Sequence, residues 1–171
     1  MTTTESTATL TGAWTIDADR SHVAFTVRHM GFMNEAGTMP ISEGTIVVGE
    51  DPGASTVTAD LDPAGFDTGN AKRDNRVRGS DFLDIEQFPT AHYRSTDVEA
   101  RGASFTVHGE LTVHGQTRPV TLVGKLTSTD DGEVAFAAST TVNRSDFGVT
   151  KMPGFIVGKG LAIELEIVAT R

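Results

Sequence analysis

Residues 103–126 read ASFTVHGELTVHGQTRPVTLVGKL. Apolar side chains occupy alternate positions on both sides of the sequence His114-Gly115-Gln116-Thr117. A period of two is typical of a strand with one buried face and one solvated face, and a short Gly-containing connection is typical of a hairpin. This stretch therefore predicts two antiparallel strands joined by a tight turn.

The same alternation recurs along most of the chain. It is clearest in Val23–Val27 and Leu161–Ile167, and similar runs lie near 44–49, 54–62, 91–99, 118–128 and 133–142. Clusters of Asp, Gly and Pro separate these runs. Only residues 69–85 break the pattern, and there we expect a short helix or two, beginning near the capping residue Asn70. The result is an all-β chain of about eight long strands with one helical segment.

A closed barrel is the favoured arrangement of these strands. Antiparallel neighbours need only short connections, and closure hides both the apolar faces and the unpaired edges. Glycines at inward-facing positions, Gly109 and Gly124, either leave volume inside the barrel or permit the strands to coil sharply. The alternative is a two-sheet sandwich, for which the strand pattern is much the same.

Composition excludes several classes of function. The absence of cysteine removes disulfide and thiolate chemistry, and fourteen basic against twenty-three acidic residues give a net charge of −9. Nucleic acids and anionic membrane surfaces are therefore not expected partners. No apolar run is long enough for stable membrane insertion, and the opening does not resemble a secretory signal, so we expect a cytoplasmic protein. Residues 1–11 are expected to form a flexible leader before a single domain over 12–171.

Short motifs spread over the whole domain carry a family resemblance. They are Trp14-Thr15-Ile16-Asp17 with Ser21-His22, Arg28-His29-Met30-Gly31, Thr68-Gly69-Asn70 with Arg73-Asp74, Ser80-Asp81-Phe82-Leu83-Asp84, Phe88-Pro89, Gly109 to Gly115 and Asn143-Arg144-Ser145-Asp146-Phe147-Gly148. In order and spacing the chain resembles the YceI family from Trp14 to about Ala169. The resemblance implies an antiparallel eight-stranded lipocalin-like barrel with a helix near its mouth. It also implies an apolar pore for a polyisoprenoid or isoprenoid quinone, and a homodimer.

Candidate ligand contacts follow from strand phase and from the loops near the expected mouth. Inward-facing apolar side chains and one inward histidine near a strand end could line the pore. A cation on the helical segment could meet a polar head group, and Met and Phe of the loop after Asn143 could form an apolar lid. The predicted contacts are Phe25, Val27, His29, Leu111, Val113, Leu122, Phe147, Met152, Phe155 and Arg76. Each has a plainer alternative, in which the apolar residues are core and His29 is hydrogen-bonded to a neighbour.

Other polar residues are expected to be structural. His108, Glu110 and His114 share one strand face, but that face also carries threonines and is interpreted as solvated, so no metal site is predicted. Arg73 is expected to pair with Asp74, Asp81 or Asp84, and Arg144 with Asp146 is expected to pin the following loop. No nucleophile with a base, and no phosphate-binding loop, is present in the sequence.

The predicted function is therefore binding, sequestration or transport of an elongated apolar small molecule, with no cofactor and no catalysis. An alternative is an enzyme that folds a reactive polyene or polyketide by shape alone, without acid or base groups. A third possibility is a structural module whose interior is packed. The sequence leaves the identity of the ligand open.

Overall fold

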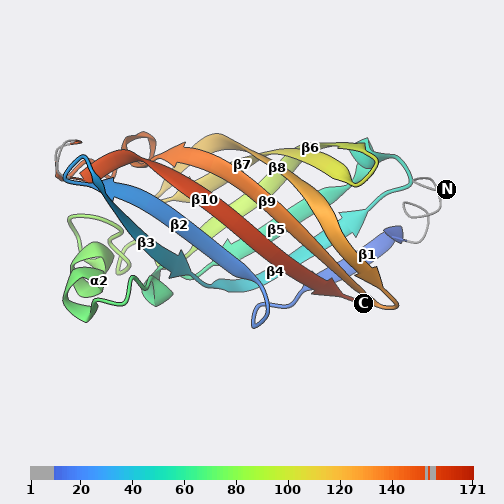
Figure 1. The fold of residues 1–171 in the computed structure, drawn as a ribbon, viewed down its shortest axis with the longest axis horizontal. Helices are drawn as coiled ribbons and strands as arrows, with labels where there is room; N and C mark the ends of the chain where they lie inside the picture. The colour runs from blue at the N-terminus through green and yellow to red at the C-terminus, as the bar shows by residue number, and fades with distance from the viewer. Residues whose placement is uncertain (1–9, 153, 155–156) are drawn as a thin grey trace.

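The computed structural model describes residues 10–152, 154 and 157–171, and in this part ten strands form one antiparallel sheet (Figure 1). Most of the leader predicted over residues 1–11 lies outside the described residues. No helix within the described residues is long and apolar enough to cross a membrane. The strands are β1 (Gly12–Ile16), β2 (His22–His29), β3 (Met33–Met39), β4 (Ile41–Val48), β5 (Thr56–Leu61), β6 (Ala91–Arg101), β7 (Ser104–Val113), β8 (Gln116–Asp130), β9 (Glu133–Asn143) and β10 (Val157–Thr170).

The sheet closes on itself, which confirms the barrel and excludes the sandwich. The strand order runs β1-β4-β5-β6-β7-β8-β9-β10, and β1 pairs again with β10, so eight strands form a ring. β2 and β3 lengthen the wall at one end, because β10 pairs with β2 over Val157 to Glu166 and with β1 only at Ala169 and Thr170. Closure leaves the ring strands without a free edge over most of their length.

The hairpin predicted from residues 103–126 is present as β7 and β8. Its turn consists of His114 and Gly115, with φ angles of 56° and 72°. Two successive left-handed residues give the turn type whose twist matches that of a two-stranded ribbon. Val107 and Val120 point inward and are buried, whereas Val123 is 57% exposed on the outer face. The alternation in the sequence therefore predicts the inner and outer faces of these strands correctly.

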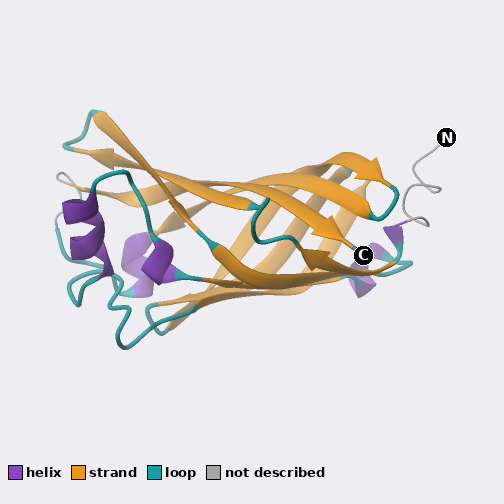
Figure 2. Ribbon diagram, turned by 90° about the horizontal axis from the view of Figure 1, so that it is seen from below, coloured by secondary structure: helices purple, strands orange, loops and turns teal. Residues whose placement is uncertain are grey.

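The helix α2 (Ala71–Arg78) lies within the predicted segment and begins as predicted. The side chain of Asn70 accepts a hydrogen bond from the backbone N–H of Arg73 at 3.0 Å, which satisfies one of the free donors of the first turn. α2 and the tip where β2 meets β3 lie at one end of the barrel, here called the helix end (Figure 2). β1 begins and β10 ends at the opposite end, here called the terminal end.

Candidate functional site: a cavity inside the barrel

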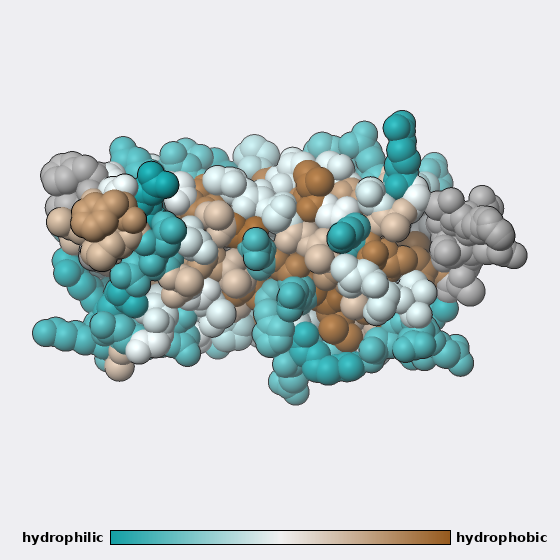
Figure 3. All heavy atoms as spheres, viewed as in Figure 1, coloured by the Kyte–Doolittle hydropathy of each residue, from teal (hydrophilic) through white to brown (hydrophobic). Residues whose placement is uncertain are grey.

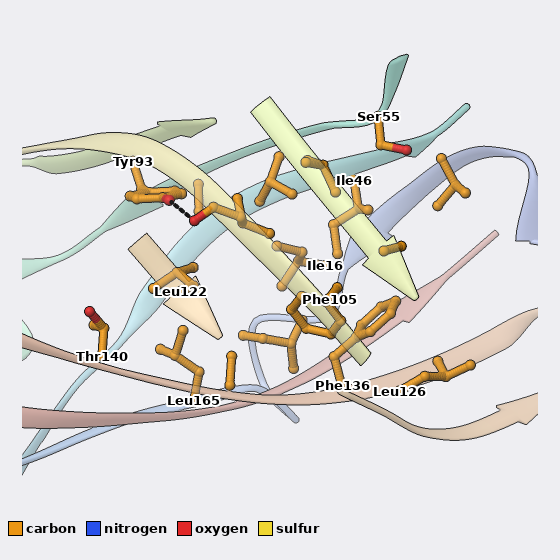
Figure 4. Close-up of a pocket in the computed structure, with 18 of the residues that line it drawn as sticks. Ile16, Ile46, Ser55, Tyr93, Phe105, Leu122, Leu126, Phe136, Thr140 and Leu165 are labelled. Carbon is orange, nitrogen blue, oxygen red and sulfur yellow. Dashed lines mark hydrogen bonds between the residues drawn. The ribbon is translucent and has the colours of Figure 1, made fainter. Parts of the chain in front are cut away.

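A cavity of about 260 Å³ lies inside the barrel (Figure 4). Its lining comes from the ring strands, from Val23 of β2 and from Gly102 and Ala103 of the β6–β7 turn, and Leu10 and Ser55 also contribute to it. It therefore extends towards the terminal end. Figure 4 labels ten of the lining residues: Ile16, Ile46, Ser55, Tyr93, Phe105, Leu122, Leu126, Phe136, Thr140 and Leu165.

The lining is almost entirely hydrocarbon. None of the lining residues is an Asp, Glu, Lys, Arg or His, and apart from the Tyr93 phenol the polar side chains are the hydroxyls of Ser55, Ser104 and Thr140. Small residues, namely Ala59, Ala100, Ala103 and Ala138, occupy inward positions where larger side chains would fill the space. An apolar cavity with a few neutral polar groups suits an apolar guest and offers no group for proton transfer at neutral pH.

Tyr93 marks the boundary of the cavity towards the helix end. Its hydroxyl donates a hydrogen bond to the carbonyl of Val120 at 2.9 Å, and burial raises its pKa to about 12. The phenol is therefore a donor over the physiological pH range. Its ring covers Gly109, where an added Cβ atom would collide with it.

The two inward glycines do not create the cavity. The space over Gly109 is occupied by Tyr93, and a Cβ atom at Gly124 would collide with the backbone of β9 at Ala137 and Ala138. Close approach of neighbouring strands therefore explains Gly124, as the coiling alternative expects. Alanines at inward positions border the cavity instead, among them Ala138 between the inward residues Phe136 and Thr140 of β9.

The helix end of the barrel is filled by aromatic side chains. Phe25 stacks on Phe66 with ring centroids 5.1 Å apart, and both are buried. Phe147 is 4% exposed and belongs to a buried cluster with Tyr93, Val107 and Val120. We call Phe25, Phe66 and Phe147 the aromatic plug. None of the three lines the cavity.

Only some of the predicted ligand contacts line the cavity. Leu111 and Leu122 line the cavity, whereas Phe25 and Phe147 belong to the aromatic plug and Val113 packs against the Phe147 cluster. Val27 is half-buried in β2 and does not line the cavity. Arg76 and Met152 meet at the helix end, with 4.0 Å between the guanidinium Nη2 and the thioether sulfur. The side chain of His29 and all of Phe155 lie outside what the structure describes.

Arg144 holds the loop between β9 and β10 in place. This buried side chain donates five hydrogen bonds of 2.7 to 3.1 Å to backbone carbonyls, and burial lowers its pKa. The acceptors are the carbonyls of Val149, Lys151, Met152, Val157 and Gly158. The prediction that Arg144 pins this loop is confirmed, but the expected partner Asp146 is exposed and takes no part.

Arg73 forms its ion pair with an acid other than the three that were predicted. Its guanidinium lies 3.2 Å from the carboxylate of Glu35 in β3 and also donates to Thr68 Oγ1 at 2.9 Å. Asp74 is buried and accepts hydrogen bonds from Thr68. Burial alone opposes ionisation of Asp74, but the bonds from Thr68 and the charges of Arg78 and Arg73 prevail and lower its pKa.

The polar outer face of β7 is arranged in separate pairs. His108 contacts Glu99 at 2.9 Å, and Glu110 contacts Arg94 at 2.7 Å. His114 lies 3.1 Å from the carbonyl of Phe147 and packs edge-on against Phe88. Within the described residues, no three His, Asp or Glu side chains are grouped as metal ligands would be.

A second, open groove of about 310 Å³ lies where the wall separates at the helix end. β8 pairs with β9 only from Val123 onward, so its first residues pair with β7 alone, while the last residues of β9 pair with β10. Arg118, Asn143 and Asp146 line this groove, and Val120 lines both the groove and the central cavity. We call it the β8–β9 seam.

Comparison with known proteins gives a consistent picture. The YceI-like domain family matches residues 14–169. A UPF0312 protein of Pseudomonas aeruginosa (strain LESB58) is 33% identical over 142 residues, which cover 78% of this chain and 74% of that protein. A UPF0312 protein of Enterobacter sp. (strain 638) is 33% identical over 143 residues, with 79% and 74% covered.

Solved structures share the fold. BcnA of Burkholderia cenocepacia superposes with a TM-score of 0.82 at 24% identity, over 91% of this chain and 99% of that chain. A domain of Saccharophagus degradans described as a polyisoprenoid binding domain, implicated in plant cell wall breakdown, has a TM-score of 0.74 at 12% identity, with 92% and 97% covered. At these identities the likeness shows the architecture alone.

Proposed function

The chain belongs to the family of YceI-like domains, and from this premise we propose that it binds an elongated apolar small molecule inside its barrel. The proposed ligand class is a polyisoprenoid or an isoprenoid quinone, the class named for the structurally similar domain of Saccharophagus degradans. The observation that carries the proposal is the cavity, whose wall is apolar and free of ionised side chains. Sequestration or transport of such a ligand follows from binding alone.

The size of the cavity sets a scale for the ligand. An engineered protein cavity of about 150 Å³ accepts benzene, so a cavity of about 260 Å³ accommodates roughly ten carbon atoms. At ~0.8 kcal/mol for each buried CH₂ group, roughly ten carbons contribute about 8 kcal/mol before the cost of immobilising the ligand. A longer chain would have to extend through the terminal end or displace the aromatic plug. The predicted contacts Phe25, Val27, His29, Val113, Phe147, Met152, Phe155 and Arg76 would serve such a longer ligand.

Two measurements test the proposal. Organic extracts of the purified protein should yield a long-chain apolar compound by mass spectrometry. Binding of a fluorescent polyprenyl probe should weaken at least about tenfold in Ala138→Phe, because the added ring occupies the cavity. Ala137→Phe is the matched control, since Ala137 is the neighbouring residue of β9 and is not part of the lining. Equal affinity of both variants and the wild type would refute binding in this cavity.

We also propose that the protein is not an enzyme. Tyr93 is the titratable side chain of the lining, and its raised pKa of about 12 makes it a poor acid or base at neutral pH. A cyclase that acts by shape alone would convert a polyene or polyketide faster than buffer does. Turnover above the buffer rate that is lost in Ala138→Phe would overturn the proposal.

We also propose a cytoplasmic location and a homodimer. The first comes from the sequence, and the second is what the family resemblance implies. Cell fractionation tests the first, and sedimentation equilibrium of the purified chain tests the second.

A further inference from the structure

Three large apolar side chains protrude together at the tip where β2 meets β3. Met30 is 49% exposed, Phe32 is 79% exposed and Met33 is 42% exposed. Among the described residues the other exposed large hydrophobic side chains are Val47 and Val123, which lie on separate strands. Figure 3 shows apolar atoms gathered at this corner of the helix end. We call Met30, Phe32 and Met33 the apolar tip.

The geometry of the loop keeps the apolar tip outside the barrel. His29 pairs with Met33, so residues 30–32 close the hairpin, and both Met30 and Gly31 adopt left-handed φ angles of 57° and 78°. A left-handed methionine is uncommon, and the strand pairs on either side hold it in place. The exposed apolar residues therefore belong to an ordered tight turn.

Basic residues adjoin the apolar tip in a protein that is acidic overall. Arg28 and Lys159 are exposed, and neither forms an ion pair within the described residues. They belong to neighbouring strands, because Val157 pairs with His29 and Gly158 packs on the backbone of Arg28. Glu35 of β3, two residues after Met33, lies 3.2 Å from the Arg73 guanidinium, and further acids lie in the β8–β9 turn at the terminal end, where Asp130, Asp131 and Glu133 follow closely in sequence. The net charge of −9 thus does not describe this corner of the molecule.

We propose that the apolar tip is a docking element for the surface of an anionic lipid bilayer. Phe and Met side chains partition into the boundary between head groups and acyl chains, and nearby Arg and Lys side chains attract anionic head groups. The contact is peripheral and reversible, because three side chains bury too little apolar surface for permanent insertion. It requires only local charge complementarity, which Arg28 and Lys159 supply.

A second copy of the chain fits this surface less well. A stable protein interface buries about 800 Å² on each partner, far more than one hairpin tip presents. A symmetric contact would also bring Arg28 and Lys159 of both copies close to one another. A bilayer meets neither obstacle, since it accepts a convex tip and carries the opposite charge.

Docking at this corner would place the β8–β9 seam near the bilayer. Asn143 at the seam pairs with Gly160, three residues along β10 from the pair between Val157 and His29. The importance of the seam rests on the proposed ligand-binding function, whereas the docking proposal does not.

Flotation with vesicles tests the proposal. The wild-type protein should bind vesicles of equal parts phosphatidylglycerol and phosphatidylcholine and should bind pure phosphatidylcholine more weakly. Phe32→Glu should lower the partition coefficient at least about tenfold, because it removes a ring that would insert into the bilayer and adds a charge that anionic head groups repel. Val123→Glu is the matched control, because it introduces the same charge at an exposed valine on the barrel wall, and it should retain binding.

Neutralising the two basic residues provides a second test. The double variant Arg28→Gln/Lys159→Gln should lose about fivefold in partition for each charge on anionic vesicles, and added salt should reduce the difference. Wild-type protein that does not float, or a Val123→Glu variant that loses as much as Phe32→Glu, would overturn the proposal. A dimer that dissociates in Phe32→Glu without vesicle binding would assign the tip to a protein interface instead. Probe binding in the cavity should be unchanged in all of these variants, so this test is separate from that of the proposed function.

Discussion

The two ends of the barrel interior differ although they are built from the same strands. Towards the terminal end, alanines and aliphatic side chains leave a cavity of about 260 Å³. Towards the helix end, the three side chains of the aromatic plug are buried, and Arg144 holds the loop that follows β9. A barrel of eight strands can be filled or hollow depending on the size of its inward side chains. This barrel is filled at one end and hollow at the other, so the alternation of side chains along its strands does not by itself decide where a ligand fits.

Substitution of Arg144 should have the largest effect on stability. In Arg144→Met five backbone carbonyls between Val149 and Gly158 lose their donor, and we expect the free energy of unfolding to fall by about 3–5 kcal/mol. Urea unfolding measures this loss. Arg118→Met is the control, because Arg118 is exposed, and its effect should stay within about 0.5 kcal/mol. A similar loss in both variants would contradict the role given to Arg144.

Truncating one side chain at each end of the interior compares how tightly the aromatic plug and the cavity wall are packed. Phe147→Ala should destabilise the protein by about 3–4 kcal/mol, because the ring is tightly packed and leaves a void. Leu165→Ala should cost less, about 2 kcal/mol, because Leu165 already borders empty space. Thermal unfolding of the two variants side by side gives the comparison. If Leu165→Ala costs more, the interior at the terminal end is packed rather than hollow.

Tyr93 sits between the two ends, and its removal should have a smaller effect. Tyr93→Phe leaves the Val120 carbonyl without its donor and should cost about 1 kcal/mol. The chain has one tyrosine, so alkaline absorbance reports this residue alone. Its folded pKa of about 12 lies above the unfolded value of about 10, so the stabilisation is complete below pH 10 and disappears as the pH rises through 12. A midpoint near 10 in the folded protein would show that the phenol is open to water.

The smallest effect concerns Asp74 in α2 and appears only in acid. Its lowered pKa means that it stabilises the fold above the unfolded value of about 3.9 and loses that contribution as the pH falls through the folded value. Asp74→Asn should therefore flatten the acid limb of a plot of unfolding midpoint against pH. Asp146→Asn, at an exposed acid, should leave the limb as steep as in the wild type.

Much of the wall could be predicted from sequence, and the partners of its polar residues could not. Asn70 as a helix cap and the His114-Gly115 turn are local features, so their signals lie within a few residues of the structure that they determine. Arg73 was expected to use an acid of its own segment, but Glu35 in β3 is closer in space. Arg144 was expected to use Asp146, but the loop carbonyls surround it. Such pairings depend on distances between segments that the sequence does not encode locally.

Alternation along the chain predicted eight of the ten strands and their inner and outer faces, and it favoured a closed barrel over a sandwich. Period two fixes which side chains face the core, because successive side chains of a strand point to opposite faces. Strands β1 and β3 were not predicted, and the pairing of β1 with β10 that closes the ring joins segments far apart in the chain. The open part of the interior also depends on tertiary contacts, because aromatic rings from the distant residues Phe25 and Phe66 stack at the helix end, whereas inward alanines border the cavity.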